Sequence, residues 1–295
     1  MTLALSAPRA ALEPCLKAPA IGTDLQLVAT WVARFASPHT RRKYQATADS
    51  FLAFLGRPLA EATLADLQAY LRTLESKASA TQANAAATLK SLFKFAQEVG
   101  ALRFNIGAAV KAPPVKNTLA ERILAEADAM RMIALEPDAR NRAFLSVLYG
   151  GGLRISEGIG LRWRDLSPRD QAGQATVYGK GGKTRTVLLS ANTWRQLIVL
   201  QEAYPPDAFV FRGRSAGYGL SAVRAHRIVK AAAARAGLSG EVSAHWLRHA
   251  HASHALDRGA PIHLVQATLG HASVATTGRY LHARPTESSA RFLGI

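Results

Sequence analysis

The sequence has few of the features that mark secreted, membrane or disulfide-bonded proteins. Its single cysteine, Cys15, cannot form an intrachain disulfide, so we expect a reducing, cytoplasmic setting. No apolar run approaches the roughly 20 residues that span a bilayer, so no membrane association is predicted. The N-terminus lacks a basic segment ahead of a sustained apolar stretch, which argues against a signal peptide, and residues 1–22 are expected to form a flexible tail.

Acidic residues are also scarce. The chain has 20 Asp+Glu against 37 Lys+Arg, which gives a net charge of +17 at pH 7 and a sequence pI near 10.6. An excess of this size favours a polyanionic partner, with an affinity that falls as salt rises. Most of the basic residues are arginine, the residue best suited to bidentate phosphate contacts, so the composition indicates a nucleic acid as partner.

Several motifs of nucleotide-binding and hydrolytic enzymes are absent. The Gly-Lys-Gly-Gly-Lys turn at 179–183 lacks the spacing of a P-loop, and no Gly-x-Ser-x-Gly elbow occurs. His245 and His249 have a helical spacing that could bind zinc, but the glutamate of a metalloprotease helix and a completing cysteine or carboxylate cluster are missing. We therefore predict no metal site. His249 is expected to pack near the catalytic face, and His251 and His254 to line the helix or to meet DNA phosphates.

Hydrophobic spacing indicates helices along most of the chain. Residues 23–110 show no strand-like alternation and are predicted to form a small helical bundle. The adjacent prolines in the segment 111–119 cannot continue a helix and mark a linker. Residues 120–295 again favour helices, interrupted by a β-hairpin predicted over 175–189. The expected fold is mainly α with a small β-hairpin or sheet, in two domains.

Four short islands in the second half of the chain contain residues suited to a phosphodiester. Arg154 and Arg248 could grip two non-bridging oxygens and stabilise the charge that grows on the phosphate. Tyr280 could attack with its phenol oxygen, although a phenol with a pKa of about 10 needs nearby positive charge and a base. This interpretation predicts a covalent link between the protein and DNA.

Four further residues could assist that reaction. His245 lies three residues before the second arginine, on the same face of a helix, and could donate a hydrogen bond or act as a base. His271 could supply another donor, and Lys180, at the turn of the hairpin, could protonate the leaving 5′ oxygen. Glu157, three residues after Arg154, could orient that guanidinium.

Each of these residues also has an ordinary structural interpretation. A lone tyrosine near a C-terminus is usually packing or surface, and Arg154 with Glu157 alone would be a helical salt bridge. The lysines of the Gly-rich turn would simply be solvated. It is the occurrence of all of these residues in one fixed order that favours catalysis.

One ordered set of residues resembles the tyrosine recombinase (phage integrase) family: Arg154, Lys180, His245, Arg248, His271 and Tyr280. Four stretches are similar to successive motifs of that family: GGLRISEGIGLRWRDL, YGKGGKTRTVLLS, HWLRHAHASHAL and LGHASVATTGRYLH. The helical part before the linker resembles the SAM-like core-binding domain of the same family. The resemblance therefore covers nearly all of the chain after the predicted tail.

The resemblance implies a site-specific recombinase that clamps double-stranded DNA and needs no cofactor. Tyr280 would be the nucleophile, forming a 3′-phosphotyrosine and freeing a 5′-hydroxyl, with strand exchange through a Holliday junction. The two arginines would clamp the phosphate, Lys180 would act as the acid and His245 as the base. His271 would be the second histidine and Glu157 the supporting acidic residue.

Further expectations follow from the resemblance. A tetramer on two DNA sites is implied, with residues 286–295 docking on a neighbouring protomer as a comparable tail does in relatives. Lys183 ranks behind Lys180 as the acid, and Gly278, where a larger residue is common, is expected to make the tyrosine segment mobile. No extra N-terminal domain and no large insertion are apparent, which favours a compact, Xer-like recombinase.

Two helical regions of the first domain are candidate DNA contacts: Arg41, Arg42, Lys43 and Tyr44, and Lys90 with Lys94. The main alternative function is a non-catalytic DNA-binding protein that kept the fold. A type IB topoisomerase with similar chemistry and a zinc protein are further alternatives. The filled catalytic positions disfavour the non-catalytic alternative. The DNA site and the biological task, whether chromosome dimer resolution, phage integration or transposon movement, stay open.

Overall fold

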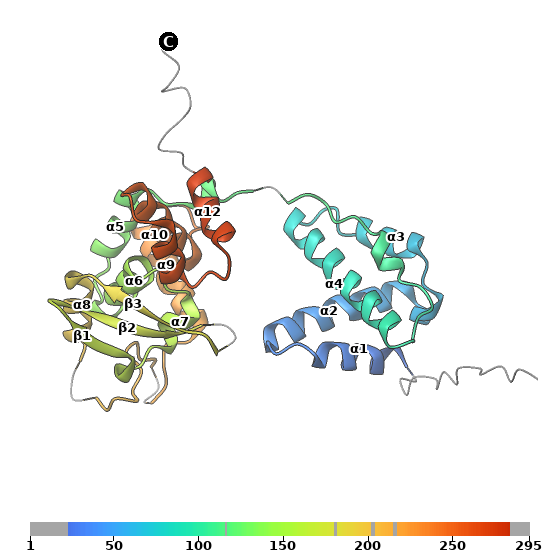
Figure 1. Cartoon of the computed structure of the whole chain (residues 1–295), viewed down its shortest axis with the longest axis horizontal. Coiled ribbons are helices and arrows are strands. Elements are labelled where there is room, and N and C mark those ends of the chain that lie inside the picture. The colour runs from blue at the N-terminus through green and yellow to red at the C-terminus, as the bar shows by residue number, and fades with distance from the viewer. Residues whose placement is uncertain (1–22, 116, 180–181, 202–203, 215–216, 284–295) are drawn as a thin grey trace, which may run out of the picture. The chain divides into compact units, whose positions relative to one another are not determined.

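The computed structural model describes residues 23–115, 117–179, 182–201, 204–214 and 217–283. The chain divides into two compact units, Met1–Lys116 (unit 1) and Asn117–Ile295 (unit 2), and their boundary falls inside the segment 111–119 (Figure 1). The finer division into tail, domain and linker stays a prediction. Within the described ranges, no helix combines the length and apolarity needed to cross a bilayer.

The described part of unit 1 is a bundle of helices: α1 (Asp24–Ala33), α2 (Pro38–Leu55), η1 (Leu59–Glu61), α3 (Leu64–Arg72), α4 (Ser79–Glu98) and η2 (Ile106–Ala109). Local chemistry fixes where these helices begin and end. Ser37 caps α2, Pro38 occupies its first turn, and Gly56 ends it at a φ of 65°, which glycine adopts without strain. A capping box of Thr63 and Asp66 begins α3.

Aromatic side chains form the core of unit 1. Trp31, Phe51 and Phe93 are fully buried, and the rings of Phe51 and Phe93 meet edge to face with centroids 5.8 Å apart. The ring of Tyr44 stacks on Trp31 at 5.2 Å, so α1 and α2 are joined through this pair. The basic residues that precede Tyr44 therefore lie on a helix that is packed against the core of unit 1.

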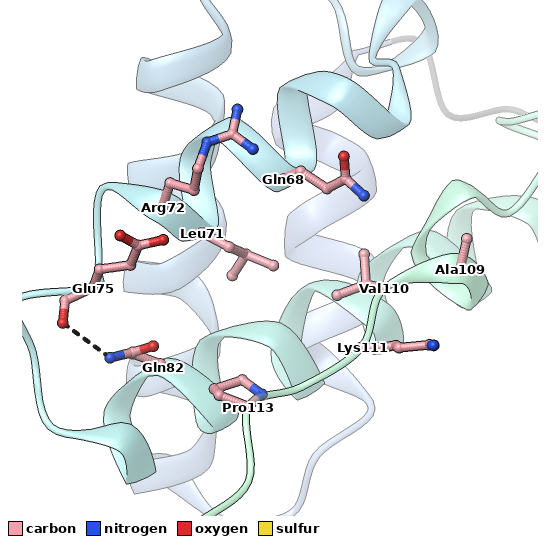
Figure 2. A pocket seen from close by; sticks show the side chains of 9 residues that line it. All are labelled: Gln68, Leu71, Arg72, Glu75, Gln82, Ala109, Val110, Lys111 and Pro113. Atoms are coloured by element: carbon pink, nitrogen blue, oxygen red, sulfur yellow. Dashed lines mark hydrogen bonds between the residues drawn. The ribbon is translucent and has the colours of Figure 1, made fainter.

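A hollow of about 560 Å³ opens on unit 1 (Figure 2). Its lining mixes apolar and polar side chains: Gln68, Leu71, Arg72, Glu75, Gln82, Ala109, Val110, Lys111 and Pro113. Gln82 Nε2 donates to the backbone carbonyl oxygens of Glu75 and Lys77 at 3.1 and 2.8 Å, which ties the start of α4 to the turn after α3. None of the predicted site residues lines this hollow.

The described part of unit 2 surrounds a small sheet with helices: η3 (Ala120–Arg122), α5 (Glu126–Ala134), α6 (Ala139–Gly150), α7 (Ile155–Gly160), η4 (Trp163–Asp165), α8 (Ala191–Ile198), α9 (Ala222–Arg235), α10 (Ala244–Asp257), α11 (Ile262–Leu269) and α12 (Val274–Ala283). The sheet has three antiparallel strands in the order β1 (Leu166–Arg169), β2 (Ala172–Tyr178) and β3 (Thr184–Leu189). The mainly helical fold with a small antiparallel sheet confirms the predicted fold class.

The sheet contains the predicted hairpin and one additional strand. Strands β2 and β3 pair from Gly173↔Leu189 to Tyr178↔Thr184, in line with the predicted hairpin. Strand β1 precedes them and was not expected, because its sequence Leu-Ser-Pro-Arg has a proline and no apolar alternation. Along β3, Val187 and Leu189 are buried whereas Leu188 is exposed, so alternate side chains face the helices.

The core of unit 2 lies between the sheet and the helices. Phe144 on α6 and Phe211 are fully buried, with ring centroids 5.0 Å apart at 73°. Val177 and Val187 close this core from the sheet side. A separate, smaller apolar cluster joins η3, α10, α11 and α12: Leu119, Ile123, Ala252, Val265, Leu269 and Tyr280.

Candidate active site

Arg154 and Glu157 lie at the start of α7 and are joined to each other. Arg154 is the N-cap residue, and its backbone N–H and Nη1 each donate to a carboxylate oxygen of Glu157 at 2.8 Å. The Glu157 side chain is only 3% exposed, whereas a third of the Arg154 side chain remains accessible. Glu157 therefore holds the Arg154 guanidinium in place through Nη1, while the exposed part of the side chain is available to bind a ligand. The contact between the two side chains agrees with the prediction, but Arg154 precedes the helix as its N-cap and does not lie within it.

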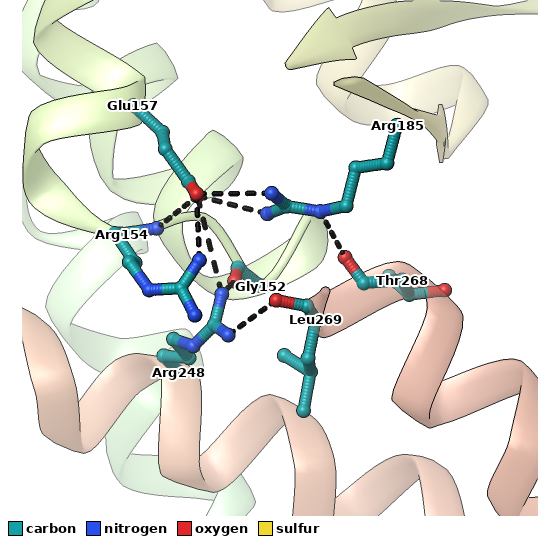
Figure 3. A network of polar contacts seen from close by, with 7 residues as sticks. All are labelled: Gly152, Arg154, Glu157, Arg185, Arg248, Thr268 and Leu269. Carbon is teal, nitrogen blue, oxygen red and sulfur yellow. Dashed lines mark hydrogen bonds and ion pairs between the residues drawn. The ribbon is translucent and has the colours of Figure 1, made fainter. Parts of the chain in front are cut away.

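Arg185 on β3 is a member of this cluster that was not predicted from the sequence. Its Nη1 and Nη2 donate to the two carboxylate oxygens of Glu157 at 2.9 and 2.8 Å, and its Nε donates to the Thr268 carbonyl oxygen at 2.7 Å (Figure 3). The sequence alternation of β3 could have predicted that Arg185 points inward, because Arg185 is on the same face of the strand as Val187 and Leu189. An arginine on the buried face of a strand requires an anionic partner.

Arg248 on α10 reaches the same cluster from the other side (Figure 3). Its guanidinium is 3% exposed and donates to the backbone carbonyl oxygens of Gly152, at 2.6 Å, and of Leu269, and Nη1 lies 4.0 Å from Glu157 Oε2. Burial and the neighbouring charge of Arg154 lower the pKa of Arg248 to about 10, which still leaves it cationic at pH 7. Three guanidiniums thus surround one carboxylate.

Glu157 is held ionised by these partners. Burial alone would raise its pKa, but hydrogen bonds from Arg185 and Arg154 outweigh that cost and lower the pKa to about 2. One negative charge among three positive ones leaves the cluster with a net positive charge at pH 7. This excess of positive charge attracts a phosphate group.

A hollow of about 480 Å³ opens beside this cluster. Its lining comes from α7, the β2–β3 hairpin and the segment after α11: Arg154, Gly179, Lys183, Thr184, Arg185, Gly270, His271, Ala272 and Thr276. Gly152 packs tightly near this cluster. Its φ is +60°, and a Cβ added there would lie 2.7 Å from the His251 ring. The close approach at Gly152 brings its carbonyl to Arg248.

His271 and Tyr280 join the cluster from the end of α11 and from α12. The two rings lie nearly parallel, with centroids 6.4 Å apart, and His271 Nδ1 is 2.8 Å from Thr277 Oγ1. Burial and the charges of Arg248 and Arg154 lower the pKa of His271 to about 4, so the ring is neutral at pH 7. The Tyr280 side chain is buried, and burial raises the pKa of its phenol.

The histidines of α10 divide into two groups. His245 is exposed and its ring stacks on that of His249, with centroids 5.7 Å apart, and His249 Nδ1 lies 2.8 Å from the Tyr280 hydroxyl oxygen. His251 Nδ1 lies 2.8 Å from the carbonyl oxygen of Tyr149, and His254 is buried. Both histidines make internal contacts, which favours the expectation that they line the helix over the alternative that they meet DNA phosphates.

The predicted N-terminal tail at residues 1–22 lies outside the described residues, and so do two further predicted features. Lys180 is one, and the docking tail at 286–295 is the other. Lys183, the second candidate for the acid, is exposed and lines the hollow described above. Within the described ranges, no group of three or more histidine, cysteine, aspartate or glutamate side chains could hold a metal ion.

The side chains predicted to contact DNA in unit 1 differ in their exposure to solvent and in their hydrogen-bond partners. Arg42 and Lys43 are exposed on α2, and Arg41, also exposed, donates through Nε to the Phe35 carbonyl oxygen at 2.5 Å. Tyr44 packs against the core, as described above. On α4, Lys90 Nζ donates to the Val110 carbonyl oxygen at 3.0 Å, and Lys94 lies 3.8 Å from Glu98 with 70% of its side chain exposed.

Comparison with known proteins agrees with this geometry. The model of the phage integrase family matches residues 118–287, and that of the phage integrase N-terminal SAM-like domain matches residues 29–100. Tyrosine recombinase XerC of Rhodospirillum centenum is 36% identical over 270 residues, covering 84% of this chain and 78% of that protein. XerC of Mesorhizobium japonicum is 33% identical over 270 residues, covering 84% and 86%.

Solved structures share the fold. The post-cleavage complex of XerH recombinase with a palindromic difH substrate has a TM-score of 0.73 at 22% identity, covering 91% of this chain and 83% of that one. A lambda integrase dimer bound to a COC′ core site has a TM-score of 0.72 at 21% identity, covering 90% and 79%. The family matches and the XerC relatives establish that this chain belongs to the phage integrase family and is an Xer-type tyrosine recombinase, an enzyme of site-specific DNA recombination.

Proposed function

We propose that Tyr280 is the nucleophile of this recombinase and that the surrounding cluster binds the scissile phosphate of double-stranded DNA. The observation that carries this proposal is the convergence of Arg154 and Arg248, from separate helices, on the buried Glu157, together with the contact of Tyr280 with His249, the residue that follows Arg248 on α10. Fixed guanidiniums stabilise charge that grows on a phosphate without reorganising during the reaction. The non-catalytic alternative is disfavoured because it gives no reason to keep this constellation.

In the proposed cleavage step, the Tyr280 oxygen attacks phosphorus and a new O–P bond forms. The bond from phosphorus to the 5′ oxygen breaks, which leaves a 3′-phosphotyrosine and a 5′-hydroxyl. The phenol proton passes to a base, a role proposed for His245, and Lys180 donates a proton to the leaving oxygen. His271 donates a hydrogen bond to the phosphate. Rejoining reverses these transfers on a partner strand, so no external energy source is needed.

A second basic surface of unit 2 supports DNA as the partner. A hollow of about 620 Å³ at the start of α9 is lined by Arg140, Arg214, Arg224 and Arg227 and by no carboxylate among its described residues. Arg140 lies 4.0 Å from Asp138 Oδ1, and a cluster of guanidiniums with so few carboxylates around it is suited to backbone phosphates. We propose that this surface and the exposed basic residues of α2 contact the duplex. Because double-stranded DNA is the proposed substrate, we also propose that the enzyme works in the cytoplasm.

We also propose that four protomers assemble on two DNA sites, with residues 286–295 docking on a neighbour. Cleavage by one active site per strand and exchange between two duplexes require four active sites. Deletion of residues 286–295 should weaken synapsis in a gel-shift assay with two labelled sites, while binding to one site persists. Normal recombination by the truncated protein would overturn the docking proposal.

Covalent trapping tests the nucleophile directly. The protein would be incubated with nicked suicide duplexes that carry candidate recombination sites, and the adduct would be resolved on a denaturing gel. Wild type should form the adduct, Tyr280→Phe should form none, and Tyr178→Phe, which alters an exposed tyrosine of the same unit, should behave as wild type. An adduct formed by the Tyr280→Phe variant would show that Tyr280 is not the nucleophile.

A further inference from the structure

The phenol of Tyr280 has an unusual setting for a nucleophile. The side chain is 6% exposed and packs in an apolar cluster formed by Leu119, Ile123, Ala252, Val265 and Leu269. A buried hydroxyl in such surroundings needs a hydrogen-bond partner. His249 Nδ1, 2.8 Å from the Tyr280 oxygen, supplies that partner.

The position of His249 on α10 makes this contact a fixed one. His249 follows Arg248 directly and lies one turn after His245, whose ring stacks on it with an interplanar angle of 13°. One side of the imidazole is therefore covered by another ring, and its Nδ1 is directed at the phenol. The same helix thus holds the phosphate-binding arginine and the partner of the tyrosine in adjacent positions.

The charges around His249 favour the neutral imidazole, which can accept a hydrogen bond. Burial, the adjacent His245 and the cations Arg248, Arg122 and Arg279 lower the pKa of His249 to about 4. Because burial also raises the pKa of Tyr280, transfer of the phenol proton to His249 is strongly unfavourable in the DNA-free protein. His249 is thus equipped to hold the phenol rather than to deprotonate it.

We propose that His249 is a positioning residue for the nucleophile, holding the Tyr280 hydroxyl through Nδ1 so that the phenol rests beside the phosphate-binding cluster before DNA arrives. This inference rests on the proposed function of Tyr280. It assigns a role to the residue that follows the second arginine.

Chemical reactivity of Tyr280 in the DNA-free protein tests the contact without any need for catalysis. The full-length protein would be treated with tetranitromethane, and nitration at each tyrosine would be followed by peptide mass spectrometry. In wild type, Tyr280 should react far more slowly than Tyr178 and Tyr218, which are 62% and 72% exposed and serve as internal references. His249→Leu should raise nitration of Tyr280 about fivefold, the effect expected from losing one hydrogen bond.

Conservative and control variants separate the hydrogen bond from general loosening. In His249→Asn, the amide oxygen takes the place of Nδ1, so nitration of Tyr280 should stay within about twofold of wild type. His263→Leu, which alters an exposed histidine on α11, should leave nitration of Tyr280 unchanged. Reference nitration at the exposed tyrosines should be the same in all variants.

The single-turnover rate of adduct formation at saturating nicked duplex supplies the second readout. His249→Leu should slow it about fivefold with unchanged DNA affinity, and His249→Asn should restore it. Equal nitration of Tyr280 in His249→Leu and wild type, or identical behaviour of the Leu and Asn variants, would overturn the proposal. An adduct that survives Tyr280→Phe would instead overturn the proposed function, and the nitration results would still stand by themselves.

Discussion

Replacing Glu157 by glutamine should destabilise unit 2 in a way that depends on pH. The carboxylate accepts hydrogen bonds from Arg154 and Arg185 and is 3% exposed, so solvent screens its charge little. Its pKa falls from 4.5 to about 2, and a difference of about 2.5 in pKa corresponds to about 3 kcal/mol of stability at pH 7. The amide would lack this contribution and would leave the guanidiniums without a buried counter-charge.

The sign of the pH dependence follows from the lowered pKa. The stabilisation by Glu157 is fully present above the unfolded pKa of 4.5 and is lost as pH falls toward about 2. Urea unfolding followed by tryptophan fluorescence would measure it, because Trp163, Trp194 and Trp246 all lie in unit 2. Glu157→Gln should be less stable than wild type by about 3 kcal/mol at pH 7, and the difference should shrink below pH 4.5.

A matched control is available in the same unit. Asp207 pairs with Arg164 at the surface, with 70% of its side chain exposed, so Asp207→Asn should change the urea midpoint little. Equal midpoints for Glu157→Gln and wild type at pH 7 would refute the reasoning. A deficit that stays constant between pH 7 and pH 3.5 would refute it as well, since it would not come from the charge.

Further outcomes are expected at three other positions. Gly152→Ala should lower the thermal stability of unit 2 by about 2 kcal/mol, because φ is +60° and the new Cβ would meet neighbouring side chains; an equal loss in Gly160→Ala, where the space is open, would contradict this. Arg185→Lys keeps the charge but loses the bidentate pair with Glu157, so adduct formation should slow roughly tenfold in a single-turnover assay, and an unchanged rate would exclude the role. Arg224→Gln should weaken DNA binding and reduce the slope of log affinity against log salt by about 1, whereas an unaltered slope would place Arg224 away from the phosphates.

The sequence was informative where local rules decide the outcome. Hydrophobic spacing and the Gly-rich turn were enough to predict a mainly helical fold with a β-hairpin. The three-residue spacing of Arg154 and Glu157 led to the expected contact, although the two residues meet as the N-cap and third residue of α7 and not as two residues within the helix. Strand β1 was missed because pairing with β2, and not its own composition, makes it a strand.

Contacts between residues that are far apart in the sequence could not be predicted from these local patterns. The inward register of Arg185 follows from the alternation of β3, but its meeting with Glu157 depends on how the hairpin packs against α7. His249 shows the same limit, because its contact with Tyr280 arises from the packing of α12 on α10. Sequence periodicity gives the direction of a side chain and carries no information on the partner across a tertiary interface.

The sequence by itself therefore determined the kind of protein and its chemical inventory: a basic, two-part, mainly helical chain with arginines, histidines and a late tyrosine in a fixed order. Only the tertiary structure decided how those groups are held. It placed one ionised carboxylate among three guanidiniums and joined the tyrosine hydroxyl to a neutral histidine. The physical reason is that burial and charge pairing are properties of the packed core, where the cost of removing charges from water selects which partners can meet.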